Sequence, residues 1–343
     1  MRRLDAHLRA AVFDHLEFTD VLRASTTDRA ARAALLCVKE VRDIKAGALS
    51  CVNVVSKLTR TRTLDVDVAE PRDLVHLAWP LTFMKALEQL SIFFVSGADM
   101  TTWEEDCEKL VRTGALRGSK NLKWFEIGML DAKRSALPMD AFHLESAAFK
   151  KLLRQLPLDC ALMTATFGCV PASCVSELLA LGADPKYTVE DLSVLESACE
   201  FQRPDVIRML LDAGACPKSD CYKAVLPREL EGDDGTRADV VELLLEFGAD
   251  PRRVGKSGST PLHDILAQNK GRRWYEILEI VEVLLDHDRS LASAVWARKE
   301  SCRETPLNTL FSFHVPVENQ PALQAAAFHA IASQLSRAES MNR

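Results

Sequence analysis

The fold of this chain of 343 residues is indicated by three similar stretches, Gly182-Ala183-Asp184-Pro185, Gly214-Ala215-Cys216-Pro217 and Gly248-Ala249-Asp250-Pro251. Each stretch follows an apolar helical run rich in leucine. The three glycines stand 32 and 34 residues apart, and spacing of this size indicates tandem structural repeats. A glycine just past a helix can take the left-handed conformation that closes the last carbonyls, and a nearby proline cannot continue the helix. We therefore predict three helix ends in phase, and a stack that presents a surface to a partner.

Two further stretches, Thr260-Pro261-Leu262-His263 and Thr305-Pro306-Leu307-Asn308, have the chemistry of helix starts. The threonine can cap free backbone donors, and proline suits the first helical position because it needs no donor there. Together with the three glycine ends, this pattern resembles the ankyrin-repeat family over residues 158–337. The resemblance implies a solenoid of four to five degenerate repeats. It also implies that His263 is a hydrogen-bonding strut within its repeat.

The middle of the chain alternates with a period of two, which is typical of strands. Strands are predicted over Leu64–Val68, Leu87–Val95 and Leu122–Gly128, and an amphipathic helix over Trp103–Leu116. The strand segments resemble those of leucine-rich repeats, which implies a short, irregular array. The alternative is a small mixed α/β domain. Asp65 and Asp67 alternate with valines, so both are expected on the solvated face of their strand.

The N-terminal residues carry an apolar stripe at helical spacing, from Leu4 to Leu16. The following corner, Leu16-Glu17-Phe18-Thr19-Asp20-Val21-Leu22, resembles an F-box. This resemblance implies docking of a Skp-type adaptor. The residues expected to dock it are Leu8, Val12, Phe13, Leu16 and Leu22. The alternative is a helical cap that shields the end of the next domain.

These readings give a mainly α fold in three parts. Residues 1–44 form the F-box-like helical segment, residues 45–150 the leucine-rich-like α/β region, and residues 151–337 the ankyrin repeats.

Composition restricts the classes of function. The net charge of −6 argues against general nucleic-acid binding, which needs a dense basic face. We find no apolar stretch of membrane-spanning length, and we expect no signal peptide, because acidic residues soon follow the first basic ones. The ten cysteines contain no Cys-x-x-Cys pair, so they are expected to be reduced core residues without zinc. This predicts a reducing compartment, the cytoplasm or the nucleus.

Motifs of catalysis are missing from the sequence. It contains no phosphate-binding glycine loop, nucleophile elbow, His-Glu-x-x-His or EF-hand pattern. We therefore predict no catalytic residue, no cofactor and no metal.

In the ankyrin family, partners bind at the hairpin tips and the concave face, so the resemblance implies contacts here. Arg, Trp and Tyr most often anchor interfaces. The expected partner-binding residues are Tyr187, Tyr222, Arg252, Arg253, Lys256, Arg272, Arg273 and Trp274. As a set they suggest an acidic peptide or protein surface, although exposed basic loops are often merely solvated.

The function expected from these patterns is protein–protein interaction without catalysis. In its sharper form the chain is a substrate receptor of a cullin-type ubiquitin ligase, a monomer outside its complex. The rival is a plain ankyrin adaptor or inhibitor without a role in ubiquitylation. A third alternative is an enzyme within residues 45–150.

Overall fold

The computed structural model describes most of the chain from residue 40 onward. The described residues are 40–45, 58–95, 97–130, 136–138, 144–166, 170–201, 203–217, 221–222, 237–254, 259–267, 274–294, 296–299, 302–312 and 322–341. Within them the protein is rich in helix and has one small, mostly parallel sheet, which agrees with the prediction of a mainly α fold. The chain forms two compact units, residues 1–190 and 191–343. The predicted boundary at residue 150 thus falls inside the first unit.

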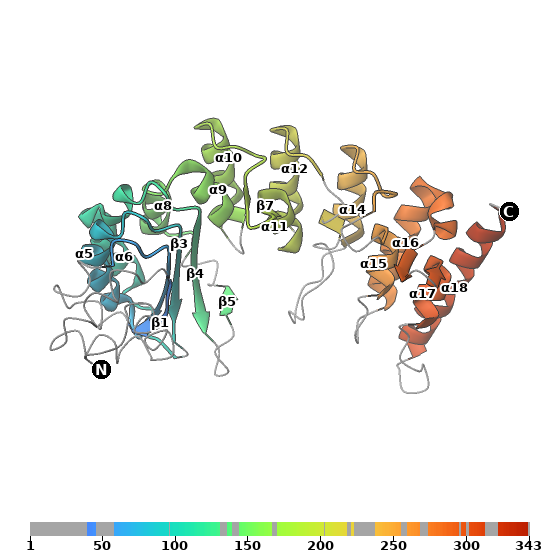
Figure 1. Cartoon of the computed structure of the whole chain (residues 1–343), viewed down its shortest axis with the longest axis horizontal. Helices are drawn as coiled ribbons and strands as arrows, with labels where there is room; N and C mark the ends of the chain where they lie inside the picture. Colours follow the sequence, from blue (N-terminus) through green and yellow to red (C-terminus); the bar gives the residue numbers. More distant parts are fainter. Residues whose placement is uncertain are drawn as a thin grey trace, which may run out of the picture. The chain divides into compact units, whose positions relative to one another are not determined.

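The first unit is built around a five-stranded sheet (Figure 1). Its strands, in their order across the sheet, are β1 (Glu40–Lys45), β2 (Thr63–Val68), β3 (Gln89–Phe94), β4 (Trp124–Leu130) and β5 (Ala136–Pro138). The first four are parallel, and β5 is antiparallel to β4. The three strands predicted from period-two alternation are confirmed, because β2, β3 and β4 lie within or overlap them.

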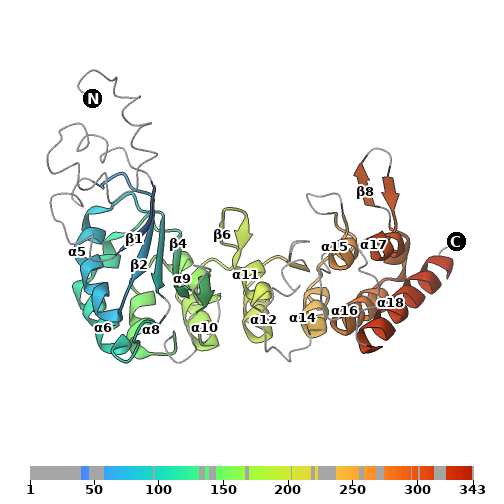
Figure 2. The same cartoon turned by 90° about the horizontal axis from the view of Figure 1, so that it is seen from below.

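Helices connect β2 to β3 and β3 to β4. The first connection holds η2 (Pro71–Leu74) and α5 (Val75–Phe83), and the second holds α6 (Trp103–Thr113) and η3 (Ala115–Gly118). Helix α8 (Ala147–Leu153) follows β5. Figures 1 and 2 show α5 and α6 on the same side of the sheet. The register aligns Leu64, Leu90 and Phe125, and all three are buried. Trp103 is 2% exposed, and its indole Nε1–H donates to Ser146 Oγ at 3.3 Å.

The last elements of the first unit are α9 (Leu158–Thr166), α10 (Ala172–Ala180) and the two-residue strand β6 (Thr188–Val189). Helix α9 packs against β4, where the buried Thr164 hydroxyl donates to the Phe125 carbonyl at 2.8 Å. Arg154 and Glu177 form two parallel hydrogen bonds of 2.9 Å between the end of α8 and α10. These contacts explain why α9 and α10 belong to the sheet unit.

The second unit is a series of packed helices with one hairpin. Its elements are β7 (Leu192–Ser193), α11 (Val194–Glu200), α12 (Pro204–Asp212), α14 (Arg237–Glu246), α15 (Pro261–Ala267), α16 (Trp274–His287), η4 (Arg289–Ser293), β8 (Trp296–Lys299), β9 (Cys302–Glu304), α17 (Pro306–Ser312) and α18 (Ala322–Met341). Helix α12 packs on α14, α14 on α16, and α16 on α18, while α15 packs on α17. Strands β8 and β9 are antiparallel.

All three predicted helix ends are confirmed. Gly182, Gly214 and Gly248 have φ values of 96°, 96° and 80°. Each glycine N–H donates to the carbonyl three residues back, and the following alanine N–H to the carbonyl five residues back, at 2.9–3.0 Å. This pair of bonds is the Schellman motif. The alanines after the glycines are buried, which accounts for the repeated Gly-Ala pair.

Of the two predicted helix starts, Thr305 caps α17 as expected, because its hydroxyl oxygen accepts from the Asn308 N–H at 3.4 Å. Ser193 and Glu196 form a capping box, in which each side chain accepts from the other residue's backbone N–H, at 3.1 and 2.7 Å. The fully buried His263 contacts the Thr260 hydroxyl through Nδ1 at 2.7 Å, as expected for a strut. Asp288 accepts from the Ser290 N–H at 3.0 Å and so begins η4.

Candidate partner-binding surfaces

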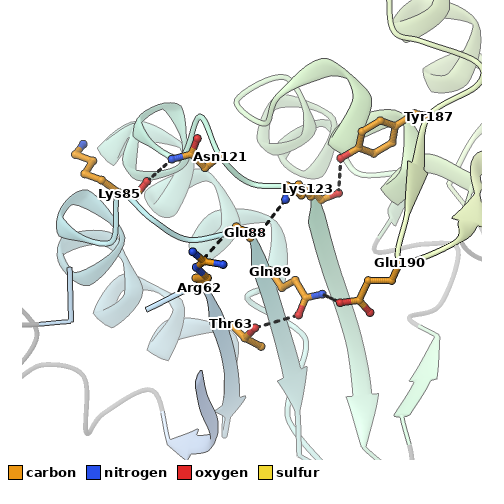
Figure 3. A network of polar contacts seen from close by, with 9 residues as sticks. All are labelled: Arg62, Thr63, Lys85, Glu88, Gln89, Asn121, Lys123, Tyr187 and Glu190. Atoms are coloured by element: carbon orange, nitrogen blue, oxygen red, sulfur yellow. Dashed lines mark hydrogen bonds and ion pairs between the residues drawn. The ribbon is translucent and has the colours of Figure 1, made fainter. Parts of the chain in front are cut away.

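A network of polar contacts covers the edge of the sheet at which β2, β3 and β4 begin (Figure 3). Glu88 accepts a hydrogen bond from Lys123 Nζ at 2.7 Å and lies 3.5 Å from Arg62 Nε. The hydrogen bond from Lys123 is the main reason why the pKa of Glu88 is lowered. Asn121 donates to the Lys85 carbonyl at 2.8 Å. These side chains join the loops that precede the three strands.

Backbone hydrogen bonds reinforce the same junction. The Arg62 carbonyl accepts from the N–H groups of Glu88 and Gln89, both at 2.8 Å. The Glu88 carbonyl accepts from Lys123 and Trp124, at 2.7 and 3.1 Å. The loops are therefore held to one another by main chain as well as by side chains.

Tyr187 joins this network from the loop after α10. Its hydroxyl donates to the Lys123 carbonyl at 3.1 Å, and burial raises the pKa of Tyr187 to about 12. Nearby, Gln89 Nε2 donates to Glu190 at 2.7 Å, and its Oε1 accepts from the Thr63 hydroxyl at 3.1 Å. Tyr187, predicted to contact a partner, thus uses its hydroxyl to hold its own loop against the sheet (Figure 3).

The sheet face opposite the buried Leu64 row carries polar side chains. The register places Asp65, Ser91 and Glu126 in one row across β2, β3 and β4. Asp65 is half-buried, but Asp67 is only 8% exposed. The expectation that Asp67 is solvated was therefore wrong, since alternation along a strand fixes the face and does not fix what packs on it.

In the second unit, Arg252 and Arg253 follow the third glycine end and are exposed, as predicted. Arg252 Nε is engaged with the Asp288 carboxylate. The hydrogen bond from Arg252 is the largest cause that lowers the pKa of Asp288 to about 2. Asp250 fixes the loop, because its carboxylate accepts from the Arg252 N–H at 2.9 Å. This arginine already has an anionic partner within its own unit.

Two of the predicted interface aromatics are buried, and those predictions were wrong. Tyr222 is 1% exposed, and its hydroxyl donates to the Ala249 carbonyl at 3.2 Å. Trp274 is 3% exposed and packs edge-on against Phe328, with ring centroids 5.1 Å apart. Both side chains belong to the interior of the second unit, so they stabilise it and do not offer an anchor to a partner.

Several predicted contact residues lie outside the described residues. They are Lys256, Arg272 and Arg273 of the second unit, and the adaptor-docking set Leu8, Val12, Phe13, Leu16 and Leu22.

Among its described residues, the second unit has two shallow open grooves between neighbouring helices; the first has mainly acidic edges, and the second has two acidic and two basic residues. The groove between α14 and α16 is lined by Glu242, Leu245, Glu246, Val283, Asp286 and His287. The groove between α16 and α18 is lined by Glu282, Leu285, Asp286, Arg289, Gln334, Arg337, Ala338 and Met341.

Side chains capable of chemistry are dispersed in the described part of the chain. No group of three or more His, Cys, Asp or Glu residues there could hold a metal ion. Burial raises the pKa of the Cys107 and Cys160 thiols to about 12, so both stay protonated at neutral pH. Within the same residues, none of the helices has the length and hydrophobicity needed to cross a bilayer.

The residues of the sheet-edge network were not identified from the sequence, apart from Tyr187. A signal was present, because polar and basic side chains stand directly before each predicted strand. Using it requires the knowledge that the strands are parallel, since only then do their first residues meet at one edge. In comparisons with known proteins, no family model matches the chain, and no curated protein is significantly similar to it.

Proposed function

We propose that this protein is a non-catalytic scaffold for protein–protein interaction, whose helical part is a degenerate ankyrin-type solenoid. The observation that carries the proposal is that the same type of helix end occurs three times. Gly182, Gly214 and Gly248 close their helices with the same pair of hydrogen bonds, at intervals of 32 and 34 residues. A supersecondary unit repeated at this period is typical of arrays that bind other proteins along an extended surface.

Details of the repeat chemistry support the same assignment. The capping box at Ser193 marks a helix start between the first two glycine ends. The Thr260–His263 contact and the Thr305 cap mark two further helix starts after the third glycine end. The parallel sheet of the first unit, with its strands in sequential order, supports a leucine-rich-like segment before the helices.

A binding experiment tests the scaffold function. The full chain is used to capture proteins from a lysate of its source, and each candidate is then purified and titrated by calorimetry. A scaffold gives at least one direct, saturable protein complex. Catalytic turnover of a small molecule with no protein complex would favour the alternative, an enzyme within residues 45–150.

The sharper hypothesis, a substrate receptor of a cullin-type ubiquitin ligase, comes from the F-box-like corner at Leu16–Leu22. It predicts that a Skp-type adaptor co-purifies with the chain and that Leu16→Asp abolishes this association. A folded wild-type protein that fails to bind the adaptor would favour a plain adaptor or inhibitor.

A further inference from the structure

The edge of the sheet in the first unit concentrates positive charge in a chain whose net charge is −6. We define the basic rim as the three segments that precede β2, β3 and β4, residues 58–62, 85–88 and 117–123. They carry six basic side chains and a single carboxylate, Glu88. The basic residues are Arg60, Arg62, Lys85, Arg117, Lys120 and Lys123, and all are exposed.

The charges of the rim are only partly neutralised. Glu88 is shared between Arg62 and Lys123. The other four cations, Arg60, Lys85, Arg117 and Lys120, form no ion pair with any residue in the described part of the chain. Two further carboxylates stand at the same edge, Glu40 at the start of β1 and Glu190 beside Gln89. The net charge of these side chains at the edge of the sheet therefore remains positive.

The rim is also preorganised. Parallel strands begin at one edge, so their leading loops lie about 5 Å apart from strand to strand. An ideal Cβ on Gly118 would be 3.0 Å from Lys85 Nζ, which shows that this ammonium lies directly against the loop before β4. The double hydrogen bonds at the Arg62 and Glu88 carbonyls fix the backbones that carry the charges. Little ordering of the rim backbone is therefore needed when a partner binds.

We propose that the basic rim is the docking site for a short acidic segment, rich in Asp and Glu, of a partner protein. This rests on the proposed scaffold function and names the chemistry of one partner. Fixed like charges repel one another, and a segment of opposite charge relieves that repulsion while it is steered to the site. The rim spans three strands, about 10 Å, which is the length of about three extended residues.

A peptide fits this surface better than a nucleic acid does. Asp65 and Glu126 lie on the polar sheet face, about 10 Å beyond the rim along the strands. A continuous phosphate backbone that crossed this face would meet these carboxylates within one Debye length. A short peptide can place its carboxylates on the rim alone.

The test measures fluorescence anisotropy with a labelled oligoglutamate peptide, at low and at high salt, on the full chain. Two double variants reverse rim charges, Arg60→Glu with Arg117→Glu, and Lys85→Glu with Lys120→Glu. The matched control is Arg208→Glu with Arg337→Glu in the second unit, where both residues are exposed and Arg208 forms an ion pair with the exposed Glu246 at 3.4 Å. Circular dichroism verifies that all three variants are folded.

The rim variants are expected to bind oligoglutamate about tenfold more weakly than the wild type, and the control less than about twofold more weakly. The effect is expected to shrink at high salt. Equal binding by the rim variants, or an equal loss in the control, would overturn the assignment. Tighter, rim-dependent binding of an oligothymidylate would overturn the choice of an acidic protein segment.

Different results would contradict the scaffold function and the assignment of the basic rim. If a captured partner binds the wild type and both rim variants with equal affinity, the scaffold function stands and the rim assignment falls. If no protein binds the full chain in any form, the scaffold function itself falls.

Discussion

Replacing Gly214 by alanine tests whether the repeated glycine is required for its backbone conformation. Its φ is +96°, a region that residues with a Cβ rarely adopt. An added Cβ would meet no atom within 4 Å, so no steric clash contributes. The strain of a left-handed alanine is about 1–2 kcal/mol. Alanine also restricts the unfolded chain, which offsets about 0.4–1 kcal/mol. We therefore expect Gly214→Ala to lower the free energy of unfolding by about 1 kcal/mol.

The assay is urea unfolding of the full chain, followed by circular dichroism and by hydrogen exchange at the Gly214 and Ala215 amides. Gly214→Asn is the control within the site, because asparagine tolerates the left-handed region, and it should cost less than alanine. Gly118→Ala is the second control, since φ of Gly118 is not in that region and only the end of a flexible lysine would have to move. An alanine variant at 214 that is as stable as the wild type would refute the reasoning for all three glycine ends.

Three further measurements probe the second unit. Tyr222→Phe removes the buried hydroxyl that donates to the Ala249 carbonyl, so we expect a loss of about 0.5–1.5 kcal/mol in urea unfolding, with unchanged affinity for any captured partner. Leu210→Ala opens a cavity at a fully buried position and should cost about 2–5 kcal/mol in the same assay. The Asp288 pKa, lowered to about 2 by Arg252, predicts a stabilisation that is present above about pH 4 and is lost as the pH falls toward 2. The urea midpoints of wild type and Arg252→Gln should therefore differ at pH 6 and converge near pH 2, and a constant difference would contradict this assignment.

Local elements were predictable from the sequence because their causes are local. The glycine ends depend on the backbone freedom of one residue and on hydrogen bonds within six residues. The strands β2, β3 and β4 depend on alternation over a few side chains. What could not be predicted is which strands pair and what covers each face, because both depend on residues far away in the chain. Asp67 illustrates the uncertainty about what covers each face, because it lies on the face expected to be solvated and is nevertheless buried.

The predicted contact residues show the same limit at the surface. Tyr222 lies between two repeat signals, where a loop residue is expected to be exposed. Its ring is instead buried, with its hydroxyl bonded to Ala249, which belongs to the next glycine end. Trp274 is the first residue of α16, and it faces Phe328 of α18. Residue type alone could not separate an interface anchor from a core residue, because both use the same large aromatic side chains.

Basic residues differ in their value for binding according to whether the fold already neutralises them. Arg252 was a reasonable candidate from the sequence, but Asp288 occupies its guanidinium, so an incoming carboxylate must compete with an internal one. Lys85 and Lys120 stand on loops fixed by main-chain bonds and have no such competitor among the described residues. A partner carboxylate there gains attraction without first breaking an ion pair. This difference, and not the density of Lys and Arg along the sequence, is the physical reason for placing the acidic partner at the sheet edge.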